Sequence, residues 1–160
     1  MKQRLETSLH LLFPVVVALR GVYRRLVRPI TVGVRALVVN ADQVLLVRTH
    51  GSQEWVLPGG AAKRGESLRA AAEREAREET GCVVEAERLL GVYLSVHEGM
   101  TNHVAVFVCR ALSPPSARLN LEIAEARYWP LSALPSRITP SLPIRLAEHA
   151  AGAQGLDGPW

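Results

Sequence analysis

One stretch of the chain sets glutamates and arginines between glycines, and these residue types can do chemistry. Residues 60–82 read GAAKRGESLRAAAEREAREETGC. The pattern predicts a helix from Ser67 onward. Because a helix turns about 100° per residue, its apolar positions fall on one narrow stripe. That stripe consists of Leu68, Ala71, Ala72 and Ala76.

Three carboxylates converge on the side of this helix that should face protein. Glu75 and Glu79 lie along the apolar stripe, and Glu78 lies on its flank with Arg74 one turn before it. A buried carboxylate cluster is costly unless it is paired or holds a cation. All-oxygen ligands suit Mg²⁺ or Mn²⁺. A plainer interpretation is a helix of good helix formers with surface ion pairs, but the angular placement favours the cation site.

Length and composition place this chain among ordinary folded proteins. Its 160 residues are enough for one domain with a real core. There is no apolar run of about 18 residues, so no membrane-spanning helix is expected. Cys82 and Cys109 lie among apolar residues and indicate reduced core thiols. We therefore expect a cytoplasmic protein, either free or peripheral to the inner face of a membrane.

The positive charge is concentrated at the N-terminus. Residues 1–35 carry seven basic residues against one acidic residue, and the remaining chain is slightly acidic. Binding to duplex nucleic acid needs a basic face on the folded core. We therefore expect no duplex nucleic acid as a partner.

Apolar residues in the N-terminal segment recur at helical spacing and predict an amphipathic basic helix that begins or bends at Pro14. Arg20, Arg24 and Arg28 form a cationic row. Residues 5–28 could pack on their own domain, form a homodimer contact, or lie on an anionic membrane surface. An export signal is disfavoured because arginines follow the apolar residues. The apolar stripe consists of Leu5, Leu9, Leu12, Val16, Leu19, Tyr23 and Leu26.

The chain from residue 31 onward alternates between strand-like runs and turns. We expect a hairpin over 31–49, a short strand at 54–57, two long strands on either side of a turn at 99–102, and a further strand at 122–129. A last helix is expected near 143–150. The tail should lack fixed structure unless Trp160 docks. We therefore divide the chain into an extension (1–30), a domain (31–150) and a tail (151–160).

The glutamate stretch resembles the Nudix box, G-x5-E-x7-R-E-U-x-E-E-x-G-U with U aliphatic. All seven fixed letters are present, Ala76 is an acceptable aliphatic residue, and Cys82 is a small departure. The flanks WVLPGG and EARYWPLSALP are also similar to Nudix flanks. The fixed letters are Gly60, Glu66, Arg74, Glu75, Glu78, Glu79 and Gly81.

This resemblance implies an α/β Nudix fold, with a mixed sheet between helices and the box as a loop-helix-loop. It implies hydrolysis of a nucleoside diphosphate linked to another moiety, with Mg²⁺ or Mn²⁺ bound. The substrate class would be a small-molecule nucleotide or a derivative of one. Subfamily markers outside the box are absent, so the resemblance leaves the individual substrate open.

The resemblance also assigns roles within the box. Glu78 and Glu79 would be the main metal ligands. Glu75 would be a third ligand or would help to deprotonate water. The Gly59 carbonyl is a further expected ligand, because glycine permits close backbone approach. Arg74 would orient a glutamate.

Other residues would support or complete the site. Glu66 would hold the loop to the helix. Arg48, at the end of a hairpin strand, is the expected contact to substrate phosphate, and Arg35 is a weaker candidate. Glu122 or Glu125 would complete the metal site or act as base, with Glu122 slightly preferred. We expect Trp55 to fill the core rather than stack on a base.

Two other function classes stay open. The chain could be a module that senses a nucleotide without turnover, although an intact carboxylate cluster argues against it. Alternatively, its basic amphipathic start could place it at a membrane surface, where it would hydrolyse a lipid-linked diphosphate.

Overall fold

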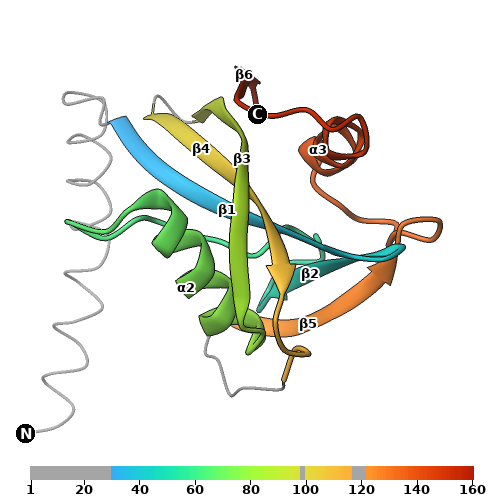
Figure 1. Ribbon diagram of the computed structural model, residues 1–160. Coiled ribbons are helices and arrows are strands. Elements are labelled where there is room, and N and C mark those ends of the chain that lie inside the picture. The colour runs from blue at the N-terminus through green and yellow to red at the C-terminus, as the bar shows by residue number, and fades with distance from the viewer. Residues whose placement is uncertain (1–29, 98–99, 117–121) are drawn as a thin grey trace, which may run out of the picture.

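A computed structural model describes residues 30–97, 100–116 and 122–160. The predicted amphipathic helix, and with it the homodimer or membrane contact through residues 5–28, lies outside the described residues. Within the described part, the expected α/β architecture of a mixed sheet with helices is confirmed (Figure 1).

Six strands form one sheet in the order β5-β2-β1-β4-β3-β6. The β1–β4 and β3–β6 pairs are parallel, and the other neighbours are antiparallel, so the sheet is mixed. The strands are β1 (Ile30–Asn40), β2 (Gln43–Thr49), β3 (Val84–His97), β4 (Met100–Ala111), β5 (Ile123–Pro130) and β6 (Leu156–Pro159).

Strands β1 and β2 meet only near their turn and then separate. Their paired residues are Val39 with Val44 and Asn40 with Gln43. The segment 56–60 lies between them beyond this point. Its backbone bonds to Val47 on β2 and to Val34 and Ala36 on β1, at N–O distances of 2.8–2.9 Å. The glycine pair at 59–60 is therefore fixed in the middle of the sheet, although it belongs to a loop.

Helix α2 (Leu68–Thr80) begins and ends where the sequence predicts. The Ser67 hydroxyl accepts a hydrogen bond from the Ala70 amide at its N-terminus. Gly81 ends the helix in the left-handed region with φ of 68°. The three alanines of its apolar stripe are buried. Small side chains allow the helix to approach the sheet closely, which brings its glutamates near the backbone of segment 56–60.

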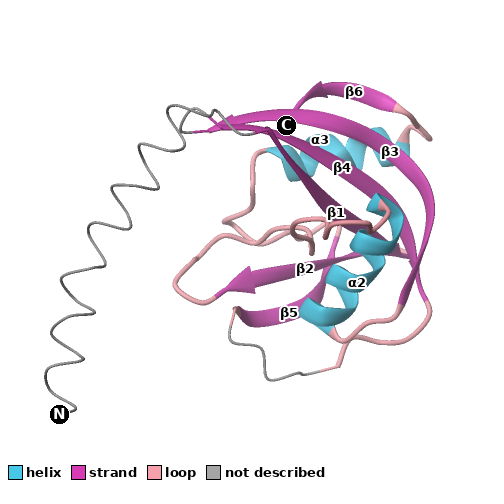
Figure 2. Cartoon of the chain, turned by 90° about the vertical axis from the view of Figure 1, so that its left-hand side faces the viewer, coloured by secondary structure: helices cyan, strands magenta, loops and turns pink. Residues whose placement is uncertain are grey.

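The two helices cover opposite faces of the sheet (Figure 2). Helix α2 packs on a core that includes Val34 and Phe107. Helix α3 (Ser141–Ala150) packs through Leu142 on the other face, where Trp55 is buried. The expectation that Trp55 fills the core is therefore confirmed, and its ring meets that of Trp129 edge-on at 5.2 Å.

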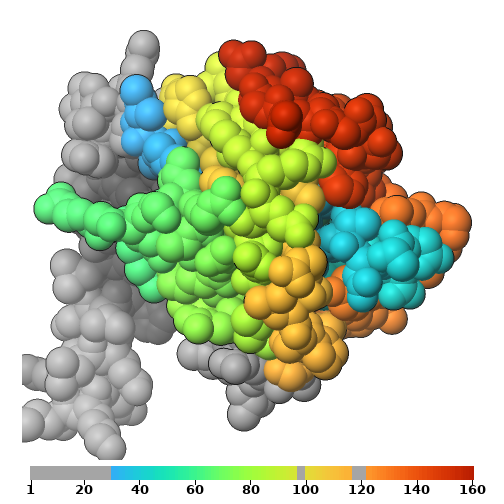
Figure 3. Space-filling model, in the orientation of Figure 1, coloured from blue at the N-terminus to red at the C-terminus, as the bar shows by residue number. Residues whose placement is uncertain are grey.

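The last residues of the chain are ordered. Strand β6 pairs with β3, and Trp160 packs near Tyr93 with a ring separation of 6.2 Å. Figure 3 shows the C-terminal residues lying against β3 rather than extending from the body. We expected the tail to lack fixed structure unless Trp160 docked. Trp160 does dock, and the tail is ordered.

The other expected elements agree with the structure with small differences. Residues 54–57 form isolated bridges rather than a strand. Residues 100–102, which we expected in a turn, belong to β4, which begins at Met100. The last helix begins at Ser141 rather than near 143. No helix among the described residues is long and apolar enough to cross a membrane.

A buried ion pair within α3 packs against Tyr93 of β3 and so fastens the helix to the sheet. The guanidinium of Arg145 lies 3.5 Å over the Tyr93 ring, and its Nε lies 3.0 Å from a Glu148 carboxylate oxygen. The Tyr93 hydroxyl donates to the same carboxylate at 2.7 Å. We expect Arg145→Ala to lower the free energy of unfolding by about 3 kcal/mol, because it leaves the Glu148 charge uncompensated.

Urea unfolding monitored by tryptophan fluorescence measures this loss. The control is Ile144→Ala at the exposed neighbouring position, which should change stability by less than about 0.5 kcal/mol. Equal stabilities of the two variants would contradict the importance of the ion pair.

Candidate active site

Helix α2 turns its glutamates toward the protein to different degrees. The Glu75 side chain is 14% exposed, whereas that of Glu78 is 49% exposed. Glu79 is half-buried. This order agrees with the wheel, on which Glu75 and Glu79 lie along the apolar stripe and Glu78 on its flank.

Arg74 holds three glutamates together. Its guanidinium makes two hydrogen bonds to Glu66, at 2.7 and 2.9 Å. It also donates to Glu75 at 2.7 Å and to Glu78 at 3.0 Å, and to the Ala61 carbonyl at 3.1 Å. The arginine therefore joins the loop before the helix to the helix itself.

The Arg74–Glu66 pair has a clear electrostatic effect. The hydrogen bond from Arg74 lowers the pKa of the Glu66 carboxyl to about 2, and the Lys63 amide adds to this effect. The pKa of Arg74 is raised in turn, chiefly by Glu66. Both groups stay charged across the whole physiological pH range, so the attraction between the loop and the helix does not depend on pH there.

Glu79 and Arg35 both form hydrogen bonds with the backbone of Gly59. The Gly59 amide donates to a Glu79 carboxylate oxygen at 2.8 Å. The Arg35 guanidinium donates to the Gly59 carbonyl at 2.8 Å and to the Leu57 carbonyl at 3.0 Å. Arg35 is thus engaged with the backbone of the inserted segment, and a contact to substrate stays a prediction.

At Gly59 and Gly60, any side chain would collide with neighbouring atoms. Gly59 has φ of 150°, and a Cβ there would lie 2.1 Å from the Val34 carbonyl oxygen. A Cβ at Gly60 would lie 2.9 Å from the Glu75 carboxyl. The backbone and the carboxylates therefore approach each other as closely as sterics allow.

Glu79 lies in surroundings that disfavour its charge. Burial raises the pKa of its carboxyl to about 7, and Glu75 and Glu122 raise it further, while the Gly59 amide and Arg35 oppose the change. The same three glutamates interact with Arg35. The charge of Glu122 therefore affects Glu79 and Arg35, as the charge of Glu75 on α2 does.

The residues at the site fit a hard divalent cation. Among the described residues, no three acidic, histidine or cysteine side chains are close enough to form a finished metal cluster. Arg74 bonds to Glu75 and Glu78, and Glu79 bonds to Gly59. The available donors are carboxylate and carbonyl oxygens, which Mg²⁺ and Mn²⁺ prefer. A cation would also favour the charged form of Glu79, whose pKa is raised by burial and, to a lesser extent, by Glu75 and Glu122.

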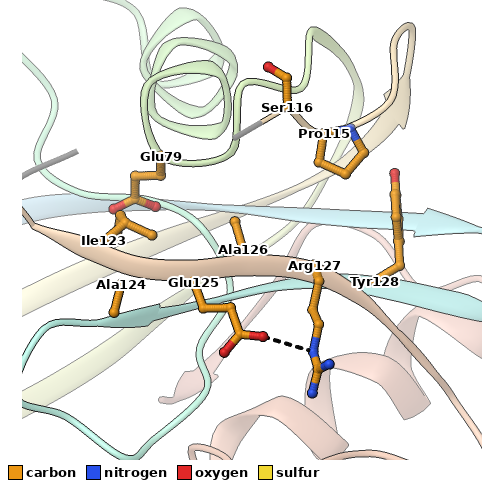
Figure 4. A pocket seen from close by; sticks show the side chains of 9 residues that line it. All are labelled: Glu79, Pro115, Ser116, Ile123, Ala124, Glu125, Ala126, Arg127 and Tyr128. Atoms are coloured by element: carbon orange, nitrogen blue, oxygen red, sulfur yellow. Dashed lines mark ion pairs between the residues drawn. The ribbon is translucent and has the colours of Figure 1, made fainter. Parts of the chain in front are cut away.

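A cavity of about 320 Å³ opens beside Glu79. Figure 4 shows Glu79 on one side of strand β5, while Glu125 and Arg127 point to the other side of it. Glu125 pairs with Arg48 and with Arg127, both at 3.3 Å. Of the two alternatives from the sequence, Glu122 interacts with the α2 charges and Glu125 is bound to arginines.

Arg48 lies in a separate groove on the other side of β5. Its guanidinium sits 5.7 Å over the Trp55 ring. Arg127 and Arg137 line the same groove, with Arg127 stacked 3.9 Å over Trp129. The sequence reasoning missed these two arginines. In the sequence, the only indication of them is that they lie ten positions apart and close to Trp129.

The raised pKa of Glu79 gives metal-free protein a stability that falls as the pH rises. An ordinary glutamate has a pKa of 4.5, and the folded value is about 7. The protonated carboxyl therefore stabilises the fold below pH 4.5, and this contribution is lost as the pH rises through 7. We expect a loss on the order of 2 to 3 kcal/mol.

Urea unfolding in EDTA at about pH 5 and about pH 8 measures this loss. Glu79→Gln should remove most of the pH dependence, while Glu85→Gln, at an exposed site, should keep it. The same pH dependence in Glu79→Gln as in the unaltered protein would contradict the assignment to Glu79.

Comparison with known proteins agrees with this geometry. The model of the NUDIX domain matches residues 29–148. A MutT-like protein of Streptomyces ambofaciens is 31% identical over 124 residues, which cover 77% of this chain and 79% of that protein. An ADP-ribose pyrophosphatase of Methanocaldococcus jannaschii is 30% identical over 118 residues, covering 71% of this chain and 69% of that protein.

Solved structures show the same likeness. A Nudix hydrolase from Nitrosomonas europaea has a TM-score of 0.70 at 26% identity, covering 79% of this chain and 93% of that chain. A UDP-X diphosphatase has a TM-score of 0.69 at 26% identity, covering 81% and 67%. The chain therefore belongs to the Nudix family of hydrolases, which act on diphosphate bonds.

Proposed function

We propose that this chain is a pyrophosphohydrolase that requires Mg²⁺ or Mn²⁺ and cleaves a nucleoside diphosphate linked to another moiety. One observation carries the proposal. Glu75 and Glu79 turn inward beside the Gly59–Gly60 backbone, in surroundings dry enough to raise the pKa of Glu79 to about 7. Without a cation, the cost of burying the charged form of Glu79 is only partly offset by the Gly59 amide and Arg35.

Each residue of the site has a separate task in this proposal. Glu78, Glu79 and the Gly59 carbonyl hold the cation, and Glu75 is a third ligand or accepts a proton from water. A bound cation would neutralise diphosphate charge and lower the pKa of water. Glu122 is the alternative base, because its charge acts on Glu79.

The remaining residues position these groups. Arg74 and Glu66 fix the loop against α2, and Gly60 and Gly81 permit the close approach and the helix end. We propose that Arg35 acts by holding the Gly59 carbonyl. Buried hydrogen-bonded partners of this kind keep ligands in a fixed orientation without touching substrate.

Two similarities support the substrate class. One relative is an ADP-ribose pyrophosphatase and one structural neighbour is a UDP-X diphosphatase. Both names describe a nucleoside diphosphate joined to a second group. The cavity beside Glu79 and the arginine groove on the other side of β5 share Glu125 and Arg127 in their linings. We propose that Arg48 in this groove contacts an anionic group of the substrate.

The carboxylates of α2 are tested by activity. We expect Glu78→Gln and Glu79→Gln each to lower kcat/KM by about 100-fold or more, because a lost ligand removes several kcal/mol of charge stabilisation. The control on the same helix is Glu73→Gln, whose amide can still accept the hydrogen bond from the Ala86 amide. Release of product from ADP-ribose, nucleotide sugars, nucleoside triphosphates and a polyprenyl diphosphate is measured with and without Mg²⁺ or Mn²⁺.

The same panel separates the alternatives. Metal-dependent turnover lost in Glu78→Gln supports the hydrolase, and the preferred compound names the substrate. Saturable nucleotide binding without turnover would favour the sensing module instead. Turnover of the polyprenyl diphosphate alone would favour the membrane-surface enzyme.

Arg48 is tested by the division between KM and kcat. We expect Arg48→Ala to raise KM about tenfold with little change in kcat, because a charge-assisted contact to an unreacting group stabilises ground state and transition state equally. Arg110→Ala, at an exposed site paired with Glu87, is the control. An unchanged KM for the best substrate would show that the groove does not contact it.

A further inference from the structure

Four exposed apolar side chains lie together at one end of the sheet. Ile30 and Val32 on β1 are 70% and 42% exposed, and Leu94 and Val96 on β3 are 45% and 67% exposed. We call these four residues the apolar patch. Large apolar side chains that are scattered singly are normal, but a group of them marks a contact surface.

The strand register brings the four residues together. Val32 and Leu94 both lie opposite His103 of β4, and Ile30 and Val96 both lie opposite Thr101. Residues opposite one another in neighbouring strands project from the same face. The patch therefore consists of two rows, each with one apolar side chain on β1 and one on β3, and with the half-buried Thr101 or His103 of β4 between them.

The patch continues the face that helix α2 covers. Side chains two positions apart on a strand share a face, so Ile30 and Val32 share the face of the buried Val34, which packs with α2. In Figure 1 the start of β1, the start of β4 and the end of β3 extend past α2. This end of the core face thus lacks a cover from either described helix.

A segment with a matching apolar stripe is attached directly to the patch. The stripe of the N-terminal segment ends at Leu26, four residues before Ile30. Four Cα–Cα steps span at most about 14 Å, so Leu26 is confined to the neighbourhood of the patch.

The dimensions of the two surfaces agree. The two rows of the patch are about 7 Å apart along the strands, and β1 and β3 are about 10 Å apart across β4. Leu19, Tyr23 and Leu26 would span about 10 Å along a helix. In that helix Arg24 and Arg28 fall on the opposite side and Arg20 falls on the flank, so all three guanidinium groups could reach water.

We propose that the apolar stripe of the N-terminal segment packs on the apolar patch of its own chain through Leu19, Tyr23 and Leu26. The occupant is the same chain rather than a second copy for two reasons. Four side chains fall short of the roughly 800 Å² that each partner buries in a stable dimer. A short tether also supplies a high effective concentration, so a small surface is enough.

Cross-linking in the full chain tests this contact. Tyr23→Cys combined with Val96→Cys should react with a short bis-maleimide to give a linked monomer, identified by mass spectrometry. The control combines Tyr23→Cys with Leu112→Cys, an exposed apolar site beyond the far end of β4. The native Cys82 and Cys109 are buried and are common to both.

Three outcomes would overturn the proposal. One is a cross-link between two chains, which would assign the patch to a second copy. Another is a reaction of the Val96 pair that is no faster than that of the Leu112 pair. The third is loss of the intrachain link, with sedimentation of the protein, when vesicles of phosphatidylglycerol and phosphatidylcholine are added, which would assign the stripe to the membrane.

Hydrogen exchange gives a second readout that needs no cross-linker. Val96→Asp should speed amide exchange in residues 16–27 about tenfold or more, because burying one such side chain contributes roughly that factor. Exchange in α2 should stay unchanged, and Leu112→Asp should alter neither region. Unaltered exchange in residues 16–27 of Val96→Asp would also overturn the proposal.

Discussion

The cost of turning charged side chains toward the protein interior organises this site. Glu75 and Glu79 lie on the face of α2 that packs against the sheet, where a carboxylate loses much of its hydration. The structure compensates with Arg74 on one side and with the Gly59 amide on the other. The part of this cost that these contacts do not offset raises the pKa of Glu79 to about 7.

These contacts require an unusual path of the chain. Strands β1 and β2 separate after two residue pairs, and segment 56–60 completes the backbone hydrogen bonding between them. The glycine pair is thereby held by the backbone hydrogen bonds of the sheet, although the φ of Gly59, 150°, is not that of a strand. The tight spacing to Val34 and to the Glu75 carboxyl follows from that position. A precise site needs such support from rigid elements.

The charges around the site divide at strand β5. On the α2 side, acidic groups predominate around Arg35, while on the other side Arg48, Arg127 and Arg137 predominate around Glu125. A diphosphate compound has a reacting group that needs a cation and further anionic groups that need arginine. This division is consistent with the proposed substrate class, and the family match alone would not have revealed it.

The helix, its caps and the angular position of its glutamates could be predicted from the sequence, because helical geometry is local and Ser67, Gly81 and the alanine stripe all indicate the same helix. The family could also be identified from the sequence, since the box is contiguous along the chain.

The other features of the site follow from how the chain packs in three dimensions. This packing placed Arg35 on the Gly59 carbonyl, brought Glu122 near the charge of Glu79 while Glu125 pairs with Arg48, and ordered the tail as β6. These features depend on which strands become neighbours and which groups lose water on packing. Neither the choice of strand neighbours nor the loss of hydration produces a periodic pattern that can be recognised in a single sequence.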